Sequence, residues 1–200
     1  EAEIEAALER VRARTMAMHK SEELGKVVKV LYQEFAKLDL VDNHTDIEIC
    51  IIDEESGEGK IWQTEESLTG QDTSLILPFT KIKQLKKEFL SWRKTEPQNR
   101  SNLLFIQEYS KQSLRDFLDV LQQVPEWKTV VDSFKNNKVD KWVTYNSYFQ
   151  FGMLTYQNIE RKAPEIETVL PRFTKVFEQT YTRFLDLKKA EVQAREAQIE

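Results

Sequence analysis

The sequence predicts an α+β fold in which an antiparallel sheet is flanked by helices, with long helices at both ends of the chain. Three observations predict it. Apolar residues recur with helical spacing in both terminal regions. The middle of the chain holds short alternating segments separated by turns, and short hairpins imply antiparallel pairing. Glycine and proline are scarce, with five of each among 200 residues, so long loops are not expected.

Two helices are expected in the N-terminal region. Over residues 3–19, apolar positions are spaced four and three residues apart, which is the rhythm of a coiled-coil seam. These positions are Ile4, Leu8, Val11, Thr15 and Met18. The second helix, over 21–38, begins at Ser21, a favoured N-cap residue. Its apolar face consists of Leu24, Val27, Val28, Leu31, Phe35 and Leu38.

Strands alternate with helices in the middle of the chain. Isoleucines at 47, 49 and 51 alternate with Glu48 and Cys50, a strand pattern with one better-buried face. A polar turn at 53–59 leads to a second strand and completes a hairpin. This second strand lies at 60–65, and the remaining elements are strands at 74–79 and 102–108 and helices at 81–95, 111–123 and 126–135. A closing hairpin, rich in aromatic residues and threonine, is expected at 141–148 and 151–157.

One helix is predicted from residue 165 to the end of the chain, with Pro171 expected to start or kink it. A second seam with the same four-three spacing runs along it. This seam consists of Phe173, Phe177, Thr180, Phe184 and Leu187. Residues 188–200 are more polar, so a lone helix there gains little from burial.

Composition excludes several classes of protein. One cysteine and two histidines permit neither an internal disulfide nor a zinc site of four cysteines or of two cysteines and two histidines. A net charge of −5 gives no nucleic-acid footprint. The longest uncharged stretch, residues 142–159, is too polar to span a bilayer. With a free cysteine and no export signal, we expect a cytoplasmic location and neither nucleic-acid nor membrane partners.

No motif for catalysis or cofactor binding is present. The sequence has no glycine-rich phosphate loop, GxSxG elbow or HExxH motif. Cys50 lies among isoleucines, so a core residue is expected there rather than a nucleophile, which needs a neighbouring base. His19 and His44 are expected to be ordinary polar residues. We therefore expect no catalytic residue, no metal and no cofactor, and a small-molecule enzyme of α+β fold stays open as an alternative.

The two ends of the chain resemble each other. Residues 196–200 match residues 1–5 at four of five positions. Chance similarity between two helices rich in Glu and Ala is one interpretation. The other is a tandem array, in which the last helix of one repeat becomes the first helix of the next. The chain begins with Glu1 rather than Met, which favours a piece of a longer protein.

Both terminal regions also resemble a known family. The run IEAALERVRARTMAM at 4–18, followed by SEEL at 21–24, resembles the first helix of GAF-like sensor repeats of bacterial signalling proteins. The run FTKVFEQTYTRFLDL at 173–187 resembles their last helix, and Phe151-Gly152 lies where their last hairpin returns. The resemblance implies an antiparallel sheet flanked by helices. It also implies terminal helices paired in a parallel homodimer, and a downstream output domain.

Two motifs of that family are not matched. The run Asn137-Lys138-Val139-Asp140 lacks the Phe of the Asn-Lys-Phe-Asp-Glu set found in cyclic-nucleotide-binding members. No histidine adjoins Cys50, whereas bilin-binding members have a cysteine beside a histidine. The resemblance therefore implies neither ligand for this chain.

These expectations combine into a non-catalytic sensory or signal-relay module. Residues 1–20 are expected to form a coiled-coil-like linker helix, 21–187 a GAF-like sensory domain, and 188–200 a helix that leads into the next repeat. Ligand or conformational state would pass through the terminal helices to an output domain. A purely structural coiled-coil spacer is the remaining alternative. The expected seams of the homodimer consist of Ile4, Leu8, Val11, Met18, Phe177, Phe184 and Leu187.

Aromatic residues on the predicted strands are candidates for a ligand pocket. GAF-like sheets that bind ligands hold them between the sheet and the covering helices, and aromatic rings with a few hydroxyls suit such a pocket. The candidate lining residues are Trp62, Trp142, Tyr145, Phe149 and Tyr156. Plain core packing is the competing interpretation for each of them.

Overall fold

The computed structural model of the chain describes residues 1–63, 75–100, 102–162 and 164–198. Its centre is a six-stranded sheet in the order β3-β2-β1-β6-β5-β4, in which every neighbouring pair is antiparallel. The strands are β1 (Asp46–Asp53), β2 (Glu58–Gln63), β3 (Leu75–Leu77), β4 (Phe105–Ser110), β5 (Lys141–Phe149) and β6 (Gly152–Asn158). The predicted antiparallel α+β fold is confirmed.

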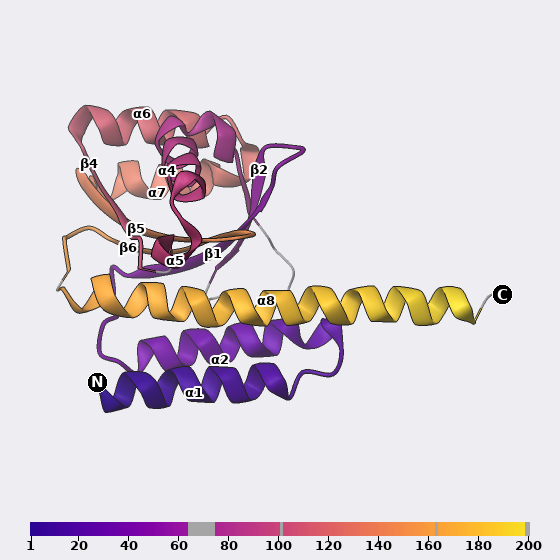
Figure 1. Ribbon diagram of the computed structural model, residues 1–200. Coiled ribbons are helices and arrows are strands. Elements are labelled where there is room, and N and C mark those ends of the chain that lie inside the picture. Colours follow the sequence, from indigo (N-terminus) through magenta and orange to yellow (C-terminus); the bar gives the residue numbers. More distant parts are fainter. Residues whose placement is uncertain (64–74, 101, 163, 199–200) are drawn as a thin grey trace.

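Three long helices cover one face of this sheet. Helices α2 (Leu24–Ala36) and α8 (Glu165–Ala197) pack on the strands, and α1 (Ala2–Met16) packs on both of these helices (Figure 1). A short 3-10 turn, η1 (Ser21–Glu23), joins α1 to α2. The apolar residues predicted for this core are buried, as expected: Leu24, Val28, Leu31, Phe35, Phe173 and Phe177.

Shorter helices cover the opposite face, above the sheet in Figure 1. They are α4 (Lys83–Lys94), α6 (Lys111–Leu121) and α7 (Lys128–Asn136), with the 3-10 turns η2 (Phe79–Lys81) and η3 (Pro125–Trp127). The short helix α5 (Pro97–Arg100) lies instead at the level of the sheet, close to α8 (Figure 1). A second apolar core lies between the helices of this opposite face and the strands. The central strands are therefore covered on both faces, so alternate residues of each strand contribute to two different cores.

Side chains of the central strands alternate strictly between the two cores, because successive strand residues point to opposite faces. On β5, Tyr145 belongs to the core under α2 and α8, whereas Tyr148 belongs to the core under α4. On β6, Leu154 and Met153 are divided in the same way. Whether a residue occupies an odd or an even position along the strand thus determines which layer of helices its side chain contacts.

The terminal helices differ from the expectation of a separate linker. Leu8, Val11, Met18 and Phe177 are buried within the single chain, and Ile4, Phe184 and Leu187 pack against the same core. These side chains pack against helices of the same chain, and their role in a homodimer seam stays a prediction. Residues 1–20 therefore pack as part of the same body as 21–187. Thr15 and Thr180 meet inside it, with 2.6 Å between their hydroxyl oxygens.

Helix α8 is continuous through Pro171, which neither starts nor ends it. Pro171 is buried and its neighbours Leu170 and Phe173 are fully buried, so core packing holds the helix where one backbone hydrogen bond is missing. At the other end, α8 runs past the body of the protein (Figure 1). Near this end, Glu191 joins α8 to the turn η1, because its carboxylate accepts hydrogen bonds from the Ser21 amide at 2.8 Å and the Ser21 hydroxyl at 2.7 Å.

Over the described residues, none of the helices combines the length and apolar character needed to cross a membrane.

Candidate functional site

A stripe of polar side chains crosses the sheet face that lies under α6 and α7. It consists of Asp46 and Glu48 on β1, Thr155 and Gln157 on β6, and Thr144 and Asn146 on β5. The strand register places them in two cross-strand rows, Asp46–Gln157–Thr144 and Glu48–Thr155–Asn146. All but Asp46 are buried. Burying so many polar groups is costly unless each finds a partner, so the stripe calls for an explanation.

A cavity of about 90 Å³ lies above this stripe. Its roof is apolar and comes from α6, η3 and α7, with Leu118, Leu121, Trp127, Val130 and Phe134 among the lining residues. The Trp127 indole N–H donates to the Ile76 carbonyl at 2.7 Å, which fixes the turn between α6 and α7 onto β3. The cavity thus has a polar floor and an apolar roof, the combination typical of small-molecule sites.

Most polar groups of the floor are satisfied within the chain. The Thr155 hydroxyl donates to the Asn146 side-chain oxygen at 3.1 Å, and the Trp142 indole N–H donates to Gln157 Oε1 at 2.8 Å. The Thr144 hydroxyl differs, because it is buried and has no hydrogen-bond partner. Leaving a buried hydroxyl without a partner costs about 1–3 kcal/mol. Thr144 is one of the residues that line the cavity.

A buried glutamate supports one end of the stripe. Glu88 on α4 accepts hydrogen bonds from Asn146 Nδ2 at 2.9 Å and the Tyr148 hydroxyl at 3.0 Å. Gln84 Nε2 donates a third, at 3.1 Å. Burial raises the pKa of Glu88, although these hydrogen bonds favour the carboxylate. The network fixes the side-chain orientation of Asn146 and hence the adjoining part of the cavity floor.

An open groove adjoins the cavity at the end of α7. It has a volume of about 830 Å³ and shares Asp46, Phe134 and Trp142 with the cavity lining. The rings of Phe134 and Trp142 meet edge to face, with 4.7 Å between their centroids. Phe134 and Trp142 therefore line both the groove and the cavity.

The structure divides the five predicted pocket residues. Trp142 lines both the cavity and the groove. Tyr145, Phe149 and Tyr156 lie on the opposite face of the sheet, in the core under α2 and α8. Trp62 lies on β2, and its backbone pairs with Ile49 of β1. Sequence reasoning followed the aromatic residues and missed the polar ones, although the alternation of polar residues at 46 and 48, 144 and 146, and 155 and 157 was visible.

Cys50 is placed where the sequence predicted, inside the core of the sheet. It is a free, buried thiol, and burial raises its pKa. That disfavours the thiolate, which is the nucleophilic form of cysteine. His44 lies in an exposed loop before β1. Over the described part of the chain, His, Cys, Asp and Glu form no group suited to holding a metal ion.

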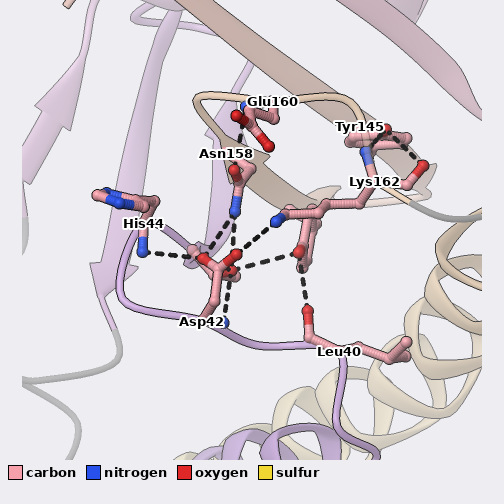
Figure 2. A network of polar contacts seen from close by, with 9 residues as sticks. Leu40, Asp42, His44, Tyr145, Asn158, Glu160 and Lys162 are labelled. Atoms are coloured by element: carbon pink, nitrogen blue, oxygen red, sulfur yellow. Dashed lines mark hydrogen bonds and ion pairs between the residues drawn. The ribbon is translucent and has the colours of Figure 1, made fainter.

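A second polar network ties the start of β1 to the segment that precedes α8 (Figure 2). Asp42 accepts hydrogen bonds from Asn158 Nδ2 and from the His44 amide, each at 2.9 Å, and pairs with the Lys162 ammonium. The Lys162 ammonium holds the pKa of the Asp42 carboxyl well below its usual range. The Lys162 amide also donates to the Tyr145 hydroxyl at 2.9 Å, so β5 is joined to the chain just before α8.

Comparisons with known proteins place this chain near GAF domains. No family model matches the sequence, and no curated protein matches it. Among solved structures, the chain is similar to the phycoerythrobilin-bound GAF domain from a cyanobacterial phytochrome, with 16% identity, a TM-score of 0.49, and 90% of this chain and 96% of that chain covered. The phycocyanobilin-bound GAF domain from a cyanobacterial phytochrome is 14% identical with the same coverage and a TM-score of 0.46. At identities and TM-scores this low, neither similarity says anything about a ligand of this chain.

Proposed function

We propose that this chain is a non-catalytic sensory module that binds a small molecule in the cavity between the sheet and helices α6 and α7. One observation carries the proposal: Thr144 lines this cavity, and its buried hydroxyl has no hydrogen-bond partner among the residues that the structure describes. A ligand with a polar group would satisfy that hydroxyl and the polar floor around it, while its apolar part would meet Leu118 and Leu121.

The cavity limits the size of that ligand. Its 90 Å³ is below the roughly 300–1,000 Å³ typical of sites for drug-sized ligands. A compact molecule of a few heavy atoms fits directly. A larger one requires Phe134 and Trp142 to move apart, which would add space from the groove. The bilins bound in the two similar GAF domains are far larger than this cavity.

Strand β5 offers a route from the cavity to α8. Thr144 and Asn146 face the cavity, and Tyr145 between them faces the other core and binds the Lys162 amide. A shift of β5 on ligand binding would therefore reach the start of α8 through one residue. We propose that α8 carries this change onward, toward neighbouring repeats or an output domain. The terminal-helix homodimer and the cytoplasmic setting stay predictions.

The three methionines give a direct test of ligand binding. Met153 lines the cavity, Met18 is buried in the core on the other face, and Met16 is exposed. With methyl-¹³C methionine, NMR of the intact chain reports each site separately. In a screen of small polar molecules, a ligand of this cavity should shift Met153 saturably and leave Met16 and Met18 unmoved. If no compound does so, a structural spacer becomes the better description.

The relay is tested with the same ligand and a single variant. Tyr145→Phe removes the hydroxyl that binds Lys162 but leaves the cavity lining intact. Ligand should slow amide hydrogen exchange in the first turns of α8 in the parent chain. In Tyr145→Phe, Met153 should still shift while α8 no longer responds. An equal response of α8 in both proteins would rule out this route.

A further inference from the structure

We propose that the ligand of this cavity is a small organic cation, an ammonium group carried on a compact apolar body. The inference rests on the proposed function, because it names the ligand chemistry of the same site. It begins with an imbalance of charge. The cavity lining includes the carboxylates of Asp46 and Glu48, whereas no Lys, Arg or His lines it among the residues the structure describes.

The cross-strand rows bring these carboxylates to the same floor as the unsatisfied hydroxyl. Asp46 and Thr144 stand at the two ends of one row, with Gln157 between them. At the usual strand spacing their backbones lie about 10 Å apart, so a compact ligand can contact both side chains. Glu48 begins the parallel row, one pleat away. A ligand on this floor therefore meets negative charge on the β1 side wherever it sits.

The Thr144 hydroxyl is a second, independent pointer to a ligand. It is 5% exposed and its oxygen has no partner. An ammonium group has three N–H donors, so it can donate to this oxygen and to a carboxylate at the same time. The roof and wall supply aromatic rings at Trp127, Phe134 and Trp142, which favour cations over their faces.

Other ligand charges fit less well. An anion would lie near two acidic residues, Asp46 and Glu48, and no Lys, Arg or His is among the described residues of the lining. A neutral alcohol would satisfy Thr144 but gain nothing from the carboxylates. Asp46 and Glu48 already take part in contacts within the chain, so the expected preference for a cation is moderate, about tenfold.

Three molecules of matched shape separate these cases: isobutylamine, isobutanol and isobutyrate. Each is titrated into methyl-¹³C methionine protein at neutral pH, where the amine is protonated. Isobutylamine should shift Met153 saturably at about one tenth of the concentration that isobutanol needs. Isobutyrate should leave Met153 unmoved. Met16 and Met18 serve as internal controls, since neither lines the cavity.

Charge-removing variants connect the preference to the lining. Glu48→Gln and Asp46→Asn should each weaken isobutylamine binding about tenfold and leave isobutanol binding unchanged. Glu55→Gln, in the exposed β1–β2 turn, makes the same change of net charge and should alter neither. The second cavity variant keeps the test decisive if the first fails to fold.

The outcomes separate this inference from the proposed function. If isobutanol or isobutyrate binds as tightly as isobutylamine, the cation preference is wrong while ligand binding in the cavity stands. If none of the three moves Met153 but xenon does, the cavity is accessible and again the cation preference alone fails. If xenon also leaves Met153 unmoved, the cavity admits no ligand and both proposals fail.

Discussion

Replacing Thr144 by valine should stabilise the chain and weaken ligand binding at the same time. The substitution removes a buried hydroxyl that has no partner and puts a methyl group of similar size in its place. The removed desolvation cost is about 1–3 kcal/mol, and we take about 1 kcal/mol as the expected gain because the cavity lets the side chain relax. For a chain of this length, that corresponds to an increase in Tm of about 2–4 °C.

Thr155→Val is the matched control, because it makes the same chemical change one row away. The Thr155 hydroxyl donates to Asn146 Oδ1 at 3.1 Å, so valine there leaves a buried acceptor without its donor. This variant should lose about 1–2 kcal/mol. Urea unfolding measures the free energy of unfolding of both variants and of the parent chain. The slope m of each variant is compared with that of the parent chain, because an unchanged slope shows that only stability has changed.

The two threonines should thus change stability in opposite directions. A loss of 1 kcal/mol or more in Thr144→Val would mean that its hydroxyl is satisfied in solution, and the main support for the ligand site would be gone. Two losses of equal size would lead to the same conclusion. A gain in Thr144→Val, together with a Met153 signal that no longer responds to isobutylamine, would connect the unsatisfied hydroxyl to binding.

Three further predictions concern the frame around the site. Phe173→Ala should cost about 3–5 kcal/mol in urea unfolding, since this ring is fully buried and meets Phe35 edge to face at 5.0 Å. Asp42 has a depressed pKa in the folded chain, so its contribution is present above about pH 4 and lost as pH falls through the acid range. With the carboxylate 41% exposed, that contribution is below about 1 kcal/mol, and Asp42→Asn should remove it from the pH profile of unfolding. Gly152→Ala should cost at least about 3 kcal/mol, because a Cβ would stand 1.8 Å from the Cys50 carbonyl oxygen, whereas Gly25→Ala in α2 meets nothing within 4 Å and should gain about 0.5–1 kcal/mol.

The elements were predictable because their periodicities are strong. The α2 face from Leu24 to Phe35 and the alternation of Ile47 and Ile49 leave little choice of helix or strand. Boundaries were less exact: β4 was expected at 102–108 and lies at Phe105–Ser110. The register shows why, since Tyr109 and Ser110 pair with Trp142 and Lys141 on β5, a contact made far along the chain.

Spacing alone does not predict which helix covers an apolar stripe. The spacing of Leu8, Val11 and Phe177 correctly indicates that each helix buries one face, but spacing carries no information on whether the covering helix belongs to the same chain. Here α1, α2 and α8 cover one another. The predicted pocket residues lie on both faces of the sheet for a related reason. Tyr145 and Trp142 are three positions apart on one strand, so their side chains point to opposite faces of the sheet.

The two faces of the sheet are built from the same strands but differ in polarity. Toward α2 and α8, the central strands present Ile49, Tyr145 and Leu154, which pack into a continuous apolar core. Toward α6 and α7 the same strands present buried polar groups under an apolar roof. Replacing all of these polar groups together by apolar residues of similar shape would be neutral or stabilising, whereas a single change such as Thr155→Val leaves its hydrogen-bond partner unsatisfied. A structural spacer would need only the apolar core under α2 and α8 for its stability. The polar face, with an unsatisfied hydroxyl, becomes favourable when a ligand supplies the missing hydrogen bond.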